Sequence, residues 1–154
     1  MNKLAQGFMF VVILFGFVLA LTPIIGAYIL SGNDRTVIKG KDDAVKLALS
    51  KWFNAPKSVF VDVHALQQND QGKRVFRFSF STLPEVVRSF IKARQLEQKE
   101  LTATDMKEIF EDKTIPWWSP EALDRKTWFT AQHENKTLNL IYNAKTQRAV
   151  LVIK

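Results

Sequence analysis

The sequence predicts an α+β protein in which one N-terminal transmembrane helix precedes a small soluble domain. The domain is expected to contain an antiparallel sheet of about five strands, with helices on one face. Three observations support this prediction: an uncharged apolar stretch near the N-terminus, segments that alternate apolar and polar residues, and apolar residues repeated at helical spacing. After the apolar stretch, the predicted elements follow in the order α-β-β-α-α-β-β-β.

Residues 8–30 are predicted to cross a membrane, because no charged residue occurs from Leu4 to Asn33. After a short tail over residues 1–7, the 23 residues of segment 8–30 make a helix of about 34 Å, enough to cross a hydrocarbon layer of about 30 Å. A cleaved signal peptide has a shorter apolar run of about 7–15 residues, so we expect an uncleaved signal anchor. Gly16 and Ala20 form a small-residue pair that would let a second membrane helix approach closely.

Two signals conflict over the orientation of this helix. The positive charges that follow it outnumber Lys3, which places the C-terminal side in the cytoplasm by the positive-inside rule. However, a short basic start before an apolar run has the form of an export signal, and long domains translocate largely regardless of charge. We therefore expect the N-terminus inside and the C-terminal domain outside, in the periplasm if the membrane is a bacterial inner membrane. A polar juxtamembrane linker, residues 31–41, leads to the domain, residues 42–154, and its stretch 36–39 can add a short strand.

The first half of the domain is predicted to be a helix followed by a β-hairpin. Residues 42–53 carry apolar side chains at helical spacing, and Pro56 limits the helix at its end. Residues 58–66 and 74–81 alternate in the manner of strands. In the first of these strands, the alternation places Val59, Val61, Val63 and Ala65 on one face and Phe60, Asp62, His64 and Leu66 on the other.

The second half is predicted to contain two helices, a short turn and three strands. Thr82 and Glu85 have the spacing of a capping box, which starts a helix running to about Glu100. A second helix is expected over residues 104–112. A short turn capped by Ser119 follows, and the remainder reads as three strands of a meander at residues 127–133, 137–142 and 148–153.

Two surface features are candidates for interaction. Trp117 and Trp118 lie between prolines in the segment IPWWSP, where exposed indoles offer area for a glycan, a lipid interface or a protein; the alternative is that they close one end of the core. The predicted helix from Thr82 to about Glu100 is expected to carry three cations on one face: Arg88, Lys92 and Lys99. They can meet anionic headgroups or an acidic partner, or simply be solvated.

The side chains that could support catalysis are few. His64 and Asp62 share the predicted strand face, and His133 lies in a later strand, so a metal site would require distant strands to converge. The helix predicted over residues 104–112 carries acidic residues that have basic neighbours and are typical of a solvated face: Glu108, Glu111 and Asp112. The sequence has no phosphate-binding loop, no nucleophile elbow and no zinc-protease motif, so we expect neither an enzyme nor a metal or other cofactor.

The composition adds limits to these expectations. The 154 residues are 47% apolar and 24% charged, which suffices for one domain with its own core. The chain contains no cysteine, which excludes disulfides and thiolate ligands. Its net charge of +7 is spread out, without the density of a nucleic-acid-binding surface, and no small-molecule substrate is indicated.

Three functions are consistent with these features. The first is a non-catalytic accessory or assembly subunit, whose partners are the lipid bilayer and one or more membrane proteins. The second is an envelope module that binds a glycan or lipid through the Trp117/Trp118 loop. The third, a membrane-tethered enzyme that uses Asp62, His64 or the acidic helix, has the least support because no motif points to a reaction.

Overall fold

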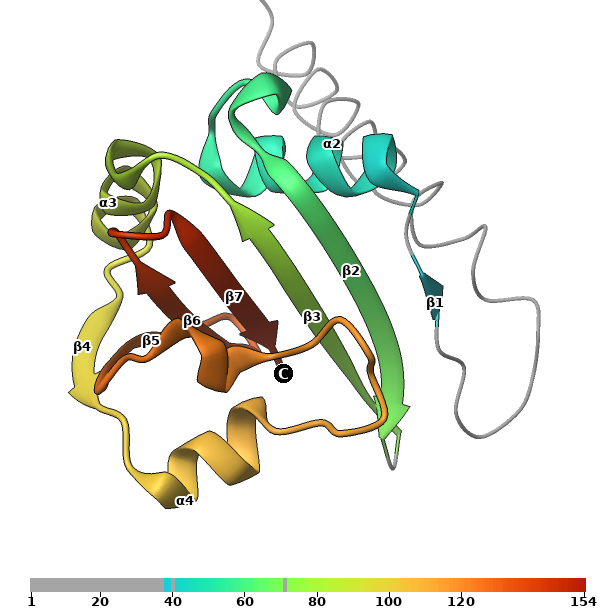
Figure 1. Cartoon of the computed structure of the whole chain (residues 1–154), viewed down its shortest axis with the longest axis vertical. Coiled ribbons are helices and arrows are strands. Elements are labelled where there is room, and N and C mark those ends of the chain that lie inside the picture. The colour runs from blue at the N-terminus through green and yellow to red at the C-terminus, as the bar shows by residue number, and fades with distance from the viewer. Residues whose placement is uncertain (1–37, 40, 71) are drawn as a thin grey trace, which may run out of the picture. The chain divides into compact units, whose positions relative to one another are not determined.

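An antiparallel β-sheet forms the middle layer of the part that the structure describes (Figure 1). The computed structural model describes residues 38–39, 41–70 and 72–154. The chain divides into two units, Met1–Asn33 and Asp34–Lys154, and the described residues all belong to the second. The predicted N-terminal tail and transmembrane helix, with Gly16 and Ala20, lie outside the described residues. Within the described ranges, no helix has the length and apolar character needed to cross a membrane.

The sheet contains seven strands within the described ranges, and every neighbouring pair is antiparallel. Their spatial order is β1-β2-β3-β7-β6-β5-β4, so the last strand of the chain lies in the middle. The prediction of an antiparallel α+β fold is therefore confirmed, with β1 at one edge, inside the stretch 36–39 that could add a strand, and the unexpected β4 at the other. The strands span Ile38–Lys39 (β1), Val61–Asp70 (β2), Lys73–Ser81 (β3), Glu97–Glu100 (β4), Thr127–His133 (β5), Lys136–Asn143 (β6) and Arg148–Ile153 (β7).

Two α-helices cover the first face of the sheet, α2 (Asp42–Phe53) and α3 (Pro84–Ala93). The core beneath them is rich in phenylalanine, and the Phe53 ring stacks on Phe90 with centroids 4.0 Å apart. The α2 helix has the predicted bounds and ends where Asn54 adopts a left-handed conformation, with φ 50°. A short 3-10 helix, η1 (Lys57–Val59), then leads into β2.

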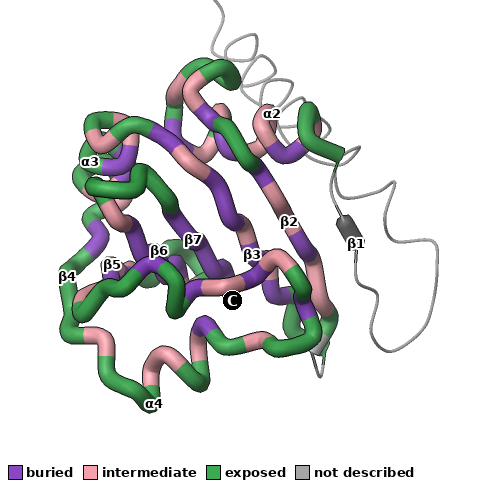
Figure 2. The backbone as a smooth tube through the Cα atoms, in the orientation of Figure 1, coloured by how far each residue is buried: buried purple, intermediate pink, exposed green. Residues whose placement is uncertain are grey.

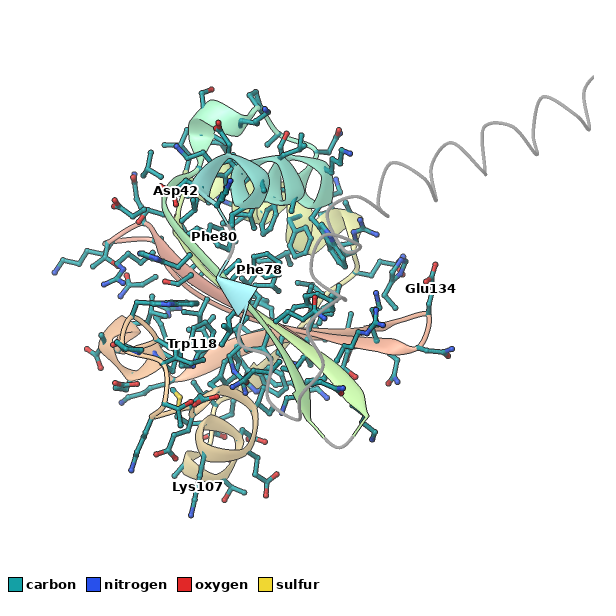
Figure 3. The ribbon with its side chains drawn as sticks, turned by 90° about the vertical axis from the view of Figure 1, so that its right-hand side faces the viewer. Asp42, Phe78, Phe80, Lys107, Trp118 and Glu134 are labelled. Atoms are coloured by element: carbon teal, nitrogen blue, oxygen red, sulfur yellow. The ribbon has the colours of Figure 1, made fainter. Side chains whose placement is uncertain are left out.

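The segment between β4 and β5, residues 101–126, covers the second face of the sheet. We call this segment the cover segment. It contains α4 (Ala103–Asp105), the π-helical turn η2 (Met106–Phe110) and the 3-10 helix η3 (Pro120–Leu123). Its two ends meet where the Leu101 amide donates to the Lys126 carbonyl, 2.8 Å away. Figure 3 shows Asp42 of α2 and Lys107 of η2 on opposite sides of the sheet.

The expectation of helices on one face is therefore wrong. The two central strands explain the difference, because β7 is buried along its whole length after Arg148 and β6 is buried from Leu138 to Tyr142 (Figure 2). Strands that are apolar on both faces need a cover on both. Apolar side chains of the cover segment form this second core together with the strands: Phe110, Ile115, Trp118 and Leu123.

A β-bulge near the start of β2 changes which residues face the first core. The register shifts between Val61 and His64, and Asp62 has a positive φ of 49°. The extra residue reverses the alternation, so Phe60 joins Val63 in the first core, whereas the sequence placed these two on opposite faces. Val61, predicted to share a face with Val63, is left 49% exposed.

The helix predicted to run from Thr82 to about Glu100 ends early in the structure. Gln95 has a positive φ of 53°, which stops the helix after Ala93 and lets the buried Leu96 turn into the first core. Residues Glu97–Glu100 then pair with β5 as the edge strand β4.

The start of that helix also differs from the prediction. The N-cap residue is Leu83, and no side chain caps it, so the expected Thr82–Glu85 capping box is absent. The Thr82 amide instead donates to the Gln147 carbonyl, 2.9 Å away, and the Tyr142 hydroxyl donates to the Thr82 carbonyl, 3.1 Å away. These two bonds hold the start of α3 against the end of the sheet.

Candidate interaction surface

The structure separates the two adjacent tryptophans of the IPWWSP segment. Trp118 is only 5% exposed, and its indole N–H donates to the Phe110 carbonyl inside the second core. Trp117 is half-buried and meets Trp118 edge-on, with ring centroids 5.9 Å apart. Trp118 therefore belongs to the core, the alternative weighed from the sequence, and the predicted contact area of this loop is confined to Trp117.

Trp117 packs against a side chain of β2. Its ring stacks on the half-buried His64 ring at 5.1 Å between centroids, with the planes 20° apart. His64 lies on the second face in regular alternation with Leu66, and the bulge at Asp62 brings Val61 to the same face. The same irregularity removes the regular two-residue spacing on which the expected Asp62–His64 pair depended.

Residues of three neighbouring strands extend this pair into a surface that we call the Trp117 shelf. Val61 pairs with Ser81 of β3, and Ser81 pairs in turn with Arg148 of β7. His64 lies in the next row of the same hairpin, opposite Ser79. Val61 and Arg148 are exposed and Ser81 is half-buried. The Trp117 shelf therefore consists of Val61, His64, Ser81, Trp117 and Arg148.

The shelf combines an aliphatic side chain, a stacked aromatic pair, a hydroxyl and a guanidinium. The indole of Trp117 has two rotatable side-chain bonds and is already held by His64 and Trp118, so little conformational entropy remains to be lost on binding. Such a surface is suited to non-covalent contact with an amphipathic partner.

A buried polar cluster anchors the cover segment beside the shelf. The Arg77 guanidinium of β3 lies 3.7 Å from the Asp112 carboxylate and donates to the Gln68 side-chain carbonyl. Asp112 also accepts bonds from the Thr114 amide at 3.0 Å and the Thr114 hydroxyl at 2.6 Å. Burial acts to raise the pKa of Asp112, but the bonds from Thr114 and Gln68 and the charge of Arg77 outweigh it and hold the pKa below its ordinary value.

The predicted basic stripe is not assembled in the structure. Arg88 and Lys92 are exposed on α3, above the first face. Lys99 lies in the edge strand β4, where its register partner is Trp128 of the second core. The expectation that these three cations share one helix face is wrong, because α3 ends before Lys99 is reached.

The candidate catalytic residues are also dispersed. His64 and His133 lie in β2 and β5, which are separated by three strands, and His133 Nε2 is 3.3 Å from Arg94 Nη1 at the first face. Glu108 and Glu111 are exposed, whereas Asp112 belongs to the buried cluster. Within the described ranges, no three residues with metal-binding side chains lie together.

Val61, Ser81 and Arg148 are shelf residues that the sequence did not indicate. Val61 belongs to an alternating run of valines, which predicts burial. Its exposure follows from the bulge, for which the only local signal is an aspartate inside a strand pattern. Ser81 and Arg148 join Val61 through the pairing of β3 with β7, a contact that no local pattern encodes.

The comparisons with known proteins give no relatives: no protein-family model, curated protein or solved structure matches this chain.

Proposed function

We propose that this chain is a single-pass membrane protein and that its α+β domain is a non-catalytic accessory or assembly subunit of a larger membrane complex. The uncharged stretch from Leu4 to Asn33 supports the anchor. In this proposal the N-terminus lies inside and the domain lies in the periplasm of a bacterium. Gly16 and Ala20 would pack against a helix of the partner.

The observation that carries this proposal is the pairing of β1 with β2. Ile38 and Lys39, at the end of the linker, pair with Gln67 and Leu66 near the middle of β2. The seven residues 31–37 lie between the apolar segment and this pairing, and an extended chain of that length spans at most about 25 Å. A connection that is both short and bonded to the sheet keeps a domain at a limited distance from the membrane, as a subunit that contacts a neighbouring membrane protein requires.

Copurification of the full chain tests the proposal. Membranes carrying tagged chain are washed at alkaline pH, extracted in mild detergent and purified on the tag. We expect the chain to stay in the washed pellet and to copurify with a defined membrane protein in a fixed ratio. Release by the alkaline wash would contradict the anchor, and a monomeric particle without a stoichiometric partner would contradict the subunit role.

A second function is supported by the half-buried Trp117. A rigidly held, partly exposed indole is typical of a module that binds a glycan or lipid of the envelope. In that case Trp117→Ala should weaken binding to isolated envelope material at least tenfold and leave the fold intact. Trp52→Ala is the matched control, because Trp52 is also half-buried and lies under the Arg94 guanidinium in the first core.

A further inference from the structure

Two exposed large apolar side chains lie near the same end of the β2–β3 hairpin. In the part of the chain that the structure describes, two large apolar residues are clearly exposed: Val61 at 49% and Leu83 at 39%. Val61 pairs with Ser81, and Leu83 follows Ser81 by two residues. The Trp117 ring stacks on His64, which pairs with Ser79 in the next row of the hairpin. Leu83 thus lies near the end of the sheet that carries the shelf.

We infer that the Trp117 shelf, together with Leu83, rests in the headgroup region of the bilayer to which the chain is anchored. This inference depends on the membrane anchor of the proposed function. Tryptophan favours the membrane interface because its ring is apolar and its N–H is polar. Val61 and Leu83 provide the apolar area beside it.

The charges around this end suit a lipid surface with either zwitterionic or anionic headgroups. Arg148 belongs to the shelf, and Lys57 of η1 lies four residues before Val61; both are exposed. Two exposed carboxylates, Asp62 and Glu85, lie nearby in the sequence. The balance is close to neutral, so apolar insertion rather than charge should dominate the contact.

Because the linker holds the domain beside the membrane, even a surface as small as the Trp117 shelf can maintain contact with the bilayer. The linker enters the sheet at Ile38, which pairs with Gln67, six residues from Val61 or about 20 Å along a strand. The linker reach of about 25 Å exceeds this distance, so the shelf can touch the bilayer while β1 stays paired. Tethering also replaces a bimolecular encounter with an intramolecular one at millimolar effective concentration, at which a weak contact is populated.

A protein partner is the competing occupant of the same surface, and spin labelling distinguishes the two. The chain contains no cysteine, so Val61→Cys provides a single labelling site in the full chain. Glu97→Cys is the matched control, since Glu97 is an exposed strand residue at the opposite edge of the sheet. Each variant is labelled with a nitroxide in vesicles of zwitterionic lipid, with and without added anionic lipid.

We expect the Val61→Cys label to be several-fold more accessible to oxygen, and several-fold less accessible to a water-soluble nickel chelate, than the Glu97→Cys label. Adding Trp117→Ala should reduce that difference, whereas adding Trp52→Ala should leave it unchanged. The result should be similar with and without anionic lipid, because the contact is mainly apolar.

Equal accessibility of the two labels to the nickel chelate would overturn the inference. Protection of Val61→Cys in native membranes, but not in pure lipid vesicles, would also overturn it and assign the shelf to a protein partner. An alkaline wash of the same vesicles distinguishes the membrane anchor from the lipid contact of the shelf. Release of the chain by the wash disproves the anchor. A chain that stays anchored but has a water-exposed Val61→Cys label disproves only the lipid contact.

Discussion

Asp112 shows how a single carboxylate joins the cover segment to the sheet. It is held by two bonds from Thr114 and by the charge of Arg77, whose side chain is 10% exposed. Replacement by asparagine removes the negative charge that Asp112 places beside the buried guanidinium of Arg77, which costs more than the loss of an exposed pair. The contribution of Asp112 therefore lies in the pairing of a charge inside the second core.

We expect Asp112→Asn to lower the free energy of unfolding by about 2 kcal/mol at neutral pH. Because the folded-state pKa of Asp112 is depressed, its stabilisation is complete above the ordinary value of 3.8 and is lost as the pH falls through the lower folded-state value. The difference between variant and parent should thus shrink below about pH 4 in urea titrations. Glu111→Gln is the control, since Glu111 pairs with the 87%-exposed Lys113 and should change stability by under about 0.5 kcal/mol.

The two tryptophans of the IPWWSP segment should respond differently to truncation. Trp118→Ala empties a buried site and removes the bond to the Phe110 carbonyl, so a loss of about 3–5 kcal/mol is expected. Trp117→Ala removes a half-buried ring and should cost about 1 kcal/mol. Urea midpoints measure both, and equal losses would show that Trp117 is as much a part of the core as Trp118.

No local pattern could have distinguished Trp117 from Trp118. In a helix or strand, the period of the element assigns each residue to a face, but these two residues lie in a loop between prolines. Their difference comes from long-range neighbours, the Phe110 carbonyl for one and the His64 ring for the other. The sequence therefore indicated the segment but not which indole is available for contact.

The elements with a strong apolar period were predicted well. The α2 helix and the strands β5 and β7 have the expected bounds, because each has a buried face with the repeat of its type. The edge strand β4 was missed because its residues Glu97–Glu100 are all exposed and polar, with no alternation. Glutamate, glutamine and lysine favour helices, and pairing with β5 overrides that preference.

The bulge in β2 offers a test at the level of an element. At Asp62, with φ 49°, glycine is unstrained, so Asp62→Gly should change stability by less than about 1 kcal/mol. A β-branched residue is strongly disfavoured there, so Asp62→Val should cost about 1–2 kcal/mol. Gln132→Val, at an exposed position of β5 without positive φ, serves as the control and should be close to neutral. Thermal unfolding measures the stability of the three variants. Equal losses of stability from Asp62→Val and Gln132→Val would show that the bulge is absent.

At the scale of the molecule, the pairing of β7 with both β3 and β6 joins the two parts of the sheet. One part contains β1 to β3, and the other contains β4 to β6. Burial of β7 on both faces after Arg148 also explains why the domain needs two cores rather than the single covered face that the sequence predicted. The number of layers depends on strand order, which pairs β7 with strands distant in sequence.

We expect deletion of residues 148–154 to abolish cooperative unfolding of the domain, because both parts of the sheet lose their shared neighbour. Deletion of Lys154 alone is the control: it removes two backbone bonds with Thr137 and a bond to the Glu108 carbonyl, and should cost about 1–3 kcal/mol. Circular dichroism and protease resistance measure the outcome. A protease-resistant core in the larger deletion would show that one part of the sheet is stable by itself.

The position of β7 also sets the timing of folding during synthesis. The ribosome releases β7 after β1 to β6, so until β7 has been synthesised each part of the sheet lacks the neighbour that the two parts share. Until β7 emerges, the unpaired edges of β3 and β6 are available to chaperones, to proteases and to premature pairing with other nascent chains.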